Sequence, residues 1–353
     1  MVQRSVAVVV LALISCKSAP PPAPEPARVA PVLEPAPAQP VEPLVELSAA
    51  RPLPDAPKGL ARVVAPDDNP LTAEKADLGW RLFFDKRLSK DGSMACVNCH
   101  HLDKAFTSGQ ALDAKVGGAM NKRNSPTVLN LGFHSLYYWD GRAPTLEAVS
   151  NAAWKGQLGA DPAVVARTLD QVPQYRALFI RAFREPPSPS NVPKAFASFF
   201  RALNSGNSPW DRFSAGDKTA LTKQQQQGQK VFFASNCATC HTPPMFSDFD
   251  FHATLSTGAD EGRKDATRDE ADLGKLKTPS LRNVALTGPY FHDGSAATLE
   301  AAITRMAAGA LKGETADREF VAVKLSVKDV SDVKAFLESL TGEATFTSEP
   351  TLP

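Results

Sequence analysis

The sequence has almost no excess of charge of either sign, because 39 lysines and arginines are balanced by 38 aspartates and glutamates. A formal net charge of +1 argues against a nucleic-acid-binding protein that depends on a strongly basic surface. Apart from a short apolar run at the N-terminus, no segment is long and apolar enough to suggest a membrane-spanning helix. No convincing alternation of apolar and polar residues indicates strands. We therefore expect a mostly α-helical protein with a packed core.

The N-terminus has the pattern of a secretory signal, in which a basic residue precedes an apolar run over residues 6–14. The run Leu13-Ile14-Ser15-Cys16 resembles the lipobox of bacterial lipoproteins. This resemblance implies that residues 1–15 are removed and that Cys16 carries a lipid. Lys17, instead of Asp, resembles the outer-membrane sorting pattern. We expect a periplasmic protein held to the outer membrane by this lipid anchor, and the alternative is an ordinary signal peptide with an incidental Cys16.

Proline is abundant and clustered, since 13 of the 30 prolines lie between Pro20 and Pro57. Proline fixes φ and has no N–H, so such a stretch forms neither helix nor sheet and behaves as an extended spacer. We expect residues 16–65 to form a disordered Pro/Ala-rich tether. The expected segments after it are an N-terminal domain at 66–214, a C-terminal domain at 215–345 and a tail at 346–353.

Cysteine is scarce, but four of the five cysteines form two identical motifs, Cys96-Val-Asn-Cys99-His100 and Cys237-Ala-Thr-Cys240-His241. A CxxCH motif is typical of c-type haem attachment, in which two thiols bond the haem vinyls and the adjacent histidine ligates the iron. A four-thiolate zinc site and a redox CxxC are the rivals. Neither rival explains a histidine at the same offset twice. The sequence therefore predicts two covalent haems, attached at Cys96, Cys99, Cys237 and Cys240, with His100 and His241 as axial ligands.

The two halves of the chain repeat the same plan. Gly79-x-x-Leu-Phe-Phe84 precedes the first motif, and Gly228-x-x-Val-Phe-Phe233 precedes the second. Beyond the motifs, Thr145-Leu-Glu-Ala148 recurs as Thr298-Leu-Glu-Ala301, 153 positions later. A duplicated single-haem unit is a stronger signal than either motif alone. We expect two tandem cytochrome c-like domains, each mostly α-helical and each with one haem.

The repeats differ at one position that bears on haem chemistry. The segment that begins at Thr298 contains Met306, and the same offset in the first half gives Ala153. A methionine thioether is a common sixth ligand that raises the potential of a c-type haem. Core packing is the alternative role for Met306. The sequence thus predicts that the second haem is six-coordinate and that the first can bind a small molecule.

These residues carry a family resemblance. Between about residues 71 and 342 the chain resembles the bacterial di-haem cytochrome c peroxidases and their MauG-like relatives. The matching runs occur in the family's order. They are Leu82-Phe-Phe-Asp85, Arg123-Asn-Ser-Pro-Thr-Val-Leu-Asn130, Trp139-Asp-Gly-Arg142, Asp260-Glu-Gly-Arg263, Pro279-Ser-Leu-Arg-Asn283 and Pro289-Tyr-Phe-His-Asp-Gly294.

The resemblance implies roles for individual residues. The haem of His100 would be the peroxide site, and the haem of His241 would receive electrons from a small donor protein, a cytochrome c or a cupredoxin. Met306 stands where the peroxidases have their methionine ligand and the MauG-like proteins have tyrosine. Trp139 matches the tryptophan between the haems. A structural calcium is implied at Asn124, Thr287 and Pro289, where oxygen ligands would suit Ca²⁺.

Several positions depart from the family's pattern. Val116 stands where many peroxidases have a removable histidine ligand, and the nearby substitutes are His134 and Met120. Val149 and Gln157 replace a glutamine and a catalytic glutamate of the distal pocket. A glutamine cannot pass the proton that splitting an O–O bond requires. We therefore expect Gln157 to line the pocket without acting as acid or base, and the first haem to have an open position.

Three functions follow from these features. The first is reduction of hydrogen peroxide by electrons from a donor protein. The second is a MauG-like oxidase that acts on residues of a partner protein. The third is a tethered electron-transfer relay without turnover of its own. No nucleic-acid partner is expected, and the resemblance leaves a homodimer open.

Overall fold

The computed structural model describes residues 47–254, 259–309, 317 and 320–353. The predicted signal peptide, Cys16 and the first part of the predicted tether lie outside the described residues. The described chain is mostly helical, which confirms the expected fold class, and its strands are two residues long. Among the described residues no helix has the length and apolarity needed to cross a membrane.

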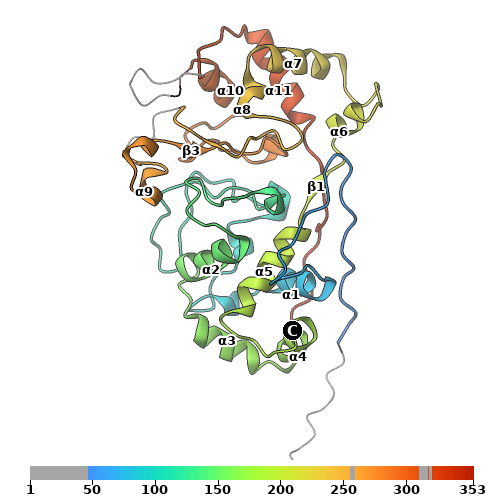
Figure 1. The fold of residues 1–353 in the computed structure, drawn as a ribbon, viewed down its shortest axis with the longest axis vertical. Helices are drawn as coiled ribbons and strands as arrows, with labels where there is room; N and C mark the ends of the chain where they lie inside the picture. The colour runs from blue at the N-terminus through green and yellow to red at the C-terminus, as the bar shows by residue number, and fades with distance from the viewer. Residues whose placement is uncertain (1–46, 255–258, 310–316, 318–319) are drawn as a thin grey trace, which may run out of the picture. The chain divides into compact units, whose positions relative to one another are not determined.

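Helices α1 and α5 form the centre of the first domain (Figure 1). Helix α1 begins after Thr72, whose hydroxyl accepts a hydrogen bond from the Lys75 amide. The two helices cross so closely that a Cβ on Gly79 would lie 2.1 Å from the Ala195 carbonyl oxygen, so only glycine fits there. The domain contains α1 (Ala73–Phe84), η1 (Lys86–Leu88), η2 (Cys96–Asn98), η3 (Leu102–Lys104), η4 (Leu131–Phe133), α2 (Leu146–Gln157), α3 (Pro162–Asp170), α4 (Pro173–Phe183) and α5 (Asn191–Ala202).

The second domain repeats this arrangement with α7 and α11. A Cβ on Gly228 of α7 would lie 1.8 Å from the Asp332 carbonyl oxygen of α11. Both glycines stand at the same place in the repeat, and both mark the crossing of the first and last helices of a domain. The elements are α7 (Lys223–Ala234), α8 (Cys237–Cys240), β2 (Phe251–His252), α9 (Lys264–Thr267), η5 (Glu270–Asp272), β3 (Leu276–Lys277), η6 (Val284–Leu286), α10 (Leu299–Ala307) and α11 (Val327–Glu338).

Backbone conformation at matching positions agrees with the duplication. Asn130 and Asn283 both adopt left-handed φ values, of 62° and 59°, just before a short 3₁₀ helix. Thr145 and Thr298 both cap the helix that follows, each through a hydroxyl that accepts an amide hydrogen bond. The sequence repeat is therefore also a repeat of local structure.

The boundary between the domains differs from the expected one. Helix α6 (Pro209–Ser214), which we had assigned to the first domain, contributes Trp210 to the core of the second. The ring of Trp210 meets the ring of Phe246 at 4.7 Å. The reason is that β1 (Ser205–Gly206) already leaves the first domain, so the segment after it packs on the second.

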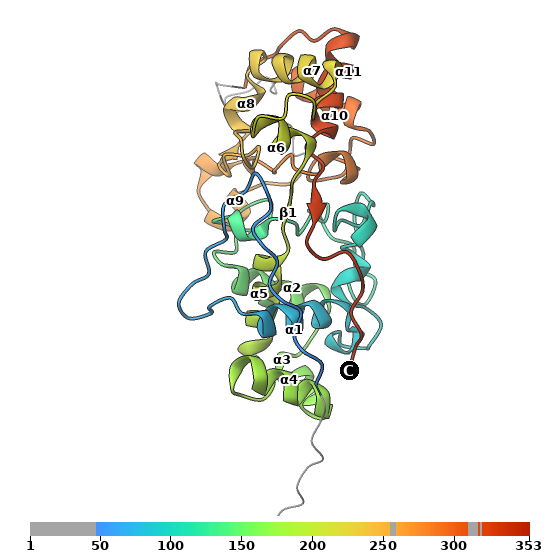
Figure 2. The ribbon, with the colours of Figure 1, turned by 90° about the vertical axis from the view of Figure 1, so that its right-hand side faces the viewer.

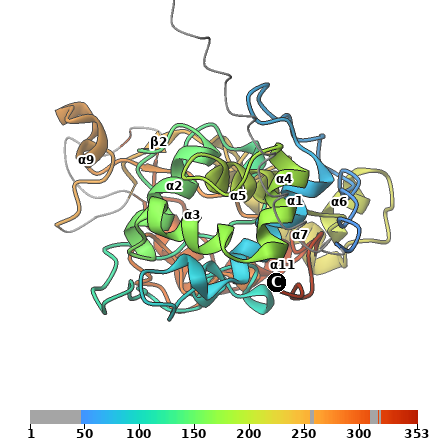
Figure 3. The same ribbon diagram turned by 90° about the horizontal axis from the view of Figure 1, so that it is seen from below.

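The chain ends fold onto the domains instead of extending from them. Strand β4 (Glu343–Ala344) pairs antiparallel with β1, and the following Phe346 is buried against Trp80 and Phe199 of the first domain (Figure 2). We expected 346–353 to be a tail outside both domains, but an aromatic residue at its start fills the first core. Figure 3 views the first domain from the end formed by α3 and α4.

The predicted tether is also shorter than expected. Residues 47–65 lie against the folded part of the chain. Arg51 donates to the Thr345 carbonyl and stacks on Phe346, and the Lys58 carbonyl accepts from the Asn207 amide. Proline-rich backbone cannot form a ladder, but its carbonyls and the side chains between the prolines still form these contacts.

Candidate functional site

The first CxxCH motif holds its histidine by two backbone contacts. The His100 amide donates to the Cys96 carbonyl at 3.1 Å. The imidazole Nδ1 lies 2.9 Å from the Phe106 carbonyl oxygen, which can only accept, so Nδ1 carries the hydrogen and Nε2 keeps its lone pair. Ala105 and Phe106 adopt left-handed φ values of 49° and 59°, which turn this carbonyl back toward the ring. Burial lowers the pKa of His100, so the ring stays neutral as an iron ligand requires.

The second motif repeats this geometry. The His241 amide donates to the Cys237 carbonyl at 3.0 Å, and Nδ1 lies 3.0 Å from the Phe246 carbonyl. Phe246 also has a left-handed φ, of 53°. Burial lowers the pKa of His241 as well. Both histidines therefore present Nε2 as the ligating atom.

The two rival interpretations of the motifs do not fit. A four-thiolate zinc site needs all four sulfurs together, but among the described residues the one cluster of metal-ligating atoms joins Cys240 with Asp248 and His252. A redox CxxC needs a thiol with a low pKa. Burial instead raises the pKa of Cys96 to about 12 and that of Cys237 to about 11. Apolar surroundings and separate motifs suit thioether bonds to two haems.

A cavity of about 350 Å³ adjoins the second motif. Cys237, Cys240 and His241 line it on one side, and Met306 of α10 also lines it. Apolar residues of α10 and α11, such as Ile303 and Leu337, form much of the remaining wall. Attachment sulfurs, a neutral imidazole, a thioether and an apolar wall together fit a c-type haem.

Trp139 lies where the two domains meet. Its indole Nε1 donates to the Asn124 carbonyl at 2.9 Å, and its own carbonyl accepts from the Lys277 amide of the second domain at 2.7 Å. Its side chain lines the cavity of the second motif. These contacts place the aromatic ring between the domains, as its predicted role as an electron bridge requires.

The three residues expected to hold calcium all line this cavity. Asn124 Nδ2 donates to the carbonyls of Gln110 and Ala111, so its Oδ1 is available as a ligand. Thr287 and Pro289 offer a hydroxyl or carbonyl oxygen each. The donor set is made of uncharged oxygens, which Ca²⁺ accepts together with water.

The predicted distal residues of the first site also lie together. The Val116 amide donates to the Gln157 carbonyl at 2.9 Å, and the Gln157 side-chain oxygen accepts from Asn121. Met120 is 56% exposed, and His134 is bound to Lys277 of the second domain. Neither substitute is therefore positioned as a replacement ligand for the first haem.

Glu147 has a structural role rather than a catalytic one. Both of its carboxylate oxygens pair with Arg201, at 2.7 and 3.1 Å. This arrangement agrees with our interpretation of Glu147 as a helix-start residue.

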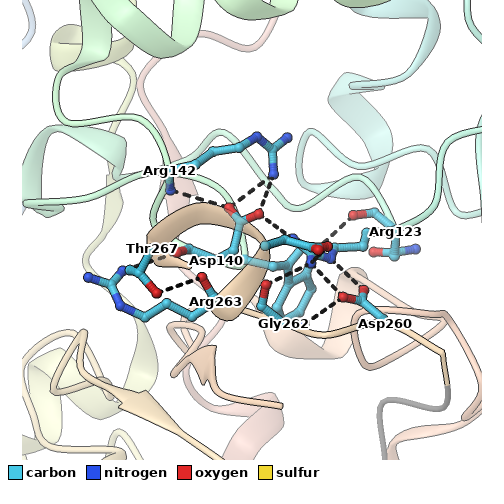
Figure 4. A network of polar contacts seen from close by, with 10 residues as sticks. Arg123, Asp140, Arg142, Asp260, Gly262, Arg263 and Thr267 are labelled. Carbon is cyan, nitrogen blue, oxygen red and sulfur yellow. Dashed lines mark hydrogen bonds and ion pairs between the residues drawn. The ribbon is translucent and has the colours of Figure 1, made fainter. Parts of the chain in front are cut away.

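An ion-pair network around Arg123 joins the domains, and we did not assign it from the sequence (Figure 4). The Arg123 guanidinium contacts Asp140 of its own domain and both carboxylate oxygens of Asp260 of the second, each at 2.6 Å. Arg263 donates to the Asp140 carbonyl at 3.0 Å. Although burial opposes the charge of Arg123, these carboxylates raise its pKa. The only sequence signal was that Arg123, Asp140 and Asp260 lie in the motifs quoted above.

Comparison with known proteins agrees with this description. A family model described as di-haem cytochrome c peroxidase matches residues 73–219, and a cytochrome c model matches residues 225–341. The methylamine utilization protein MauG of Methylophilus methylotrophus is 38% identical over 299 residues, 82% of this chain and 89% of that protein. The cytochrome c551 peroxidase of Nitrosomonas europaea is 34% identical over 80% of this chain and 85% of its own length. A MauG-like protein associated with microbial copper homeostasis has a similar crystal structure, with a TM-score of 0.77, 31% identity, and coverage of 82% of this chain and 95% of its own.

The fold and the two motifs define a redox protein with two c-type haems in tandem cytochrome c-like domains. The chain belongs to the family of di-haem cytochrome c peroxidases and MauG proteins. It is an enzyme of the cytochrome-c peroxidase type.

Proposed function

We propose that the chain reduces hydrogen peroxide to water at the site of His100, with electrons that a small cytochrome c or cupredoxin delivers to the site of His241. The observation that carries this proposal is the asymmetry between matching helices. Met306 on α10 lines the second cavity, whereas the matching residue on α2 is Ala153, which has no ligating atom. A thioether favours electron transfer, and a site without a sixth ligand can bind a small molecule.

Haem supplies the redox chemistry at both sites when bound, and the chain sets its ligands and surroundings. His100 and His241 keep Nε2 unprotonated because Nδ1 donates to a backbone carbonyl. Trp139 holds an aromatic ring at the contact between the domains, which shortens the path of an electron. Gln157 contributes a neutral amide near the first site and no proton.

The test supplies hydrogen peroxide and a reduced small cytochrome c to the purified holoprotein. A peroxidase consumes peroxide and oxidises the two cytochromes that each peroxide requires. A relay accepts the electrons but leaves the peroxide concentration unchanged. The double variant Cys96→Ala/Cys99→Ala is the control: it should retain about half of the covalent haem on a denaturing gel, accept electrons, and consume no peroxide.

A MauG-like oxidase is the second candidate, and Gln157 favours it. This neutral residue stands where the resemblance implies a catalytic glutamate, so peroxide cleavage lacks its usual proton donor. Met306 opposes it, because the MauG-like proteins have tyrosine at that position. An oxidase would leave a mass change on residues of a partner protein after treatment with peroxide, and a peroxidase would not.

We also propose a calcium ion held by Asn124, Thr287 and Pro289, and a periplasmic location with a lipid on Cys16. The calcium proposal is supported by the shared cavity and the available Asn124 oxygen. Elemental analysis of the purified protein tests it. The location is supported by the N-terminal pattern, and mass spectrometry of the mature N-terminal peptide tests it.

A further inference from the structure

Lys277 is a buried cation between the two domains. It ends β3 and is 7% exposed. Its ammonium donates to the Leu136 carbonyl at 2.6 Å and to His134 Nδ1 at 3.0 Å, and both acceptors belong to the first domain. One of its three N–H donors is therefore left over.

Lys277 has no counter-charge in direct contact. Among the described residues no carboxylate lies within ion-pair distance of its ammonium, and Asp140 acts on it only from farther away. Burial lowers the pKa of Lys277 to about 8. A buried charge is costly unless it is paired, so this position favours the arrival of an anion.

His134 adds a second donor at the same place. Because the Lys277 ammonium donates to Nδ1, the hydrogen of the neutral ring is on Nε2, and no described residue accepts it. Burial and the nearby ammonium hold the pKa of His134 well below its usual range, so the ring does not compete for positive charge. Phe249 lies against the imidazole, with ring centres 4.5 Å apart, and limits its movement.

Both residues line the cavity that also contains Cys237, Cys240 and His241. A haem attached to these cysteines brings two propionate carboxylates into a wall that is otherwise largely apolar. An ammonium and an imidazole N–H together bind a carboxylate by charge-assisted hydrogen bonds.

We propose that Lys277 and His134 form an anion subsite that binds a propionate carboxylate of the haem attached to Cys237 and Cys240. One half of this subsite comes from each domain, so contact between the domains helps to set the potential of the second haem. The ammonium disfavours the more positive ferric state and thus raises this potential. The proposal rests on the second haem and not on peroxide turnover, so either one can fail without the other.

The test compares Lys277→Met with Lys275→Met in the holoprotein. Both variants remove one positive charge from the same segment, but Lys275 is more exposed and pairs with Asp272. Potentiometric titration of Lys277→Met should show the ferric/ferrous equilibrium of the second haem shifted about tenfold toward ferric, ~59 mV for one electron. Lys275→Met and the charge-retaining Lys277→Arg should shift it much less.

Resonance Raman spectroscopy provides a readout that does not depend on potential. His134→Phe keeps the charge of Lys277 but removes one donor, so it should shift the propionate bending band of the second haem, as Lys277→Met should. This variant also serves if Lys277→Met does not fold. Unchanged bands in both variants would overturn the proposal. So would a potential that varies with added acetate while the bands stay fixed, because the subsite would then hold a free anion.

Discussion

The indole Nε1 of Trp139 donates a hydrogen bond of 2.9 Å to the backbone carbonyl of Asn124. Asn124 is one of the residues proposed to hold calcium, and Trp139 is the proposed electron bridge. An ion bound by Asn124 would fix the residue that positions the indole. The calcium site and the path between the haems are therefore coupled through one residue.

The first prediction concerns removal of calcium. Chelation should slow peroxide-driven oxidation of the reduced second haem, because Asn124 would no longer hold Trp139 in place. Stopped-flow absorbance of that haem measures the rate, and added Ca²⁺ should restore it while Mg²⁺, which demands tighter octahedral geometry, should not. An equal rate before and after verified calcium removal would contradict the coupling.

The second prediction concerns Met306. Met306→His should keep the second haem six-coordinate but lower its midpoint potential, since a thioether raises the potential relative to imidazole. Titration followed by absorbance measures the change. A potential identical to that of the parent protein would mean that Met306 only packs against the cavity wall.

The third prediction concerns the first haem. Val116 and Ala153 offer no ligand, Met120 is exposed, and His134 is bound to Lys277. Cyanide should therefore bind the fully oxidised protein, and peroxide should be consumed without prior reduction of the second haem.

An electron paramagnetic resonance spectrum of the oxidised protein checks this claim, because an open site gives a high-spin component. Two low-spin haems would refute it. With Gln157 in place of an acid, turnover should also be slow, since positioned acid–base help is worth about 10²–10⁴-fold. Gln157→Glu should then raise the rate.

The fourth prediction concerns the crossing of α1 and α5. Gly79→Ala should lower the free energy of unfolding by about 1–3 kcal/mol or more, because its Cβ would overlap the Ala195 carbonyl. Gly156 of α2 provides the control: a Cβ there meets nothing within 4 Å, so Gly156→Ala should stabilise by about 0.5–1 kcal/mol. Denaturant unfolding followed by circular dichroism measures both. Equal effects of the two variants would contradict the prediction.

The fifth prediction concerns a buried ion pair. Arg282 donates to both carboxylate oxygens of Asp211, at 2.8 and 3.0 Å, and both side chains are almost fully buried. Arg282→Met should destabilise by about 3–5 kcal/mol, because it leaves a buried charge without its partner. Thermal unfolding at neutral pH gives the magnitude.

The same pair predicts a pH dependence. Burial would raise the pKa of Asp211, but Arg282 outweighs it and the pKa is lowered in the folded protein. The contribution is therefore complete above the unfolded pKa, about 3.9, and is lost as the pH falls through the lowered folded value. Asp211→Asn should make the stability of the protein less sensitive to pH in this acid range.

The sequence predicts features that depend on neighbouring residues. Thr72, Thr145 and Thr298 cap helices because a hydroxyl needs only the next few amides. The haem motifs are equally local, since three residues separate the first cysteine of each motif from the second. The glycines before each motif stand at matching helix crossings, which the repeat itself suggests.

Contacts between distant segments were not predictable in this way. Arg123 meets Asp260 across 137 positions, and Lys277 meets His134 across 143. No periodicity or spacing specifies which surfaces of two domains come into contact. The helices α3 and α4 were missed for another reason: they stand outside the repeated plan, so the duplication carried no signal for them.

The burial of Phe346 has a consequence for the order in which the protein is completed. Synthesis runs from the N-terminus, so Phe346 is made only after the whole second domain. Until then Trp80 and Phe199 lack the ring that covers them. The domain that is translated first is thus finished last, and a chain interrupted within the second domain leaves the first with an aromatic surface open to water.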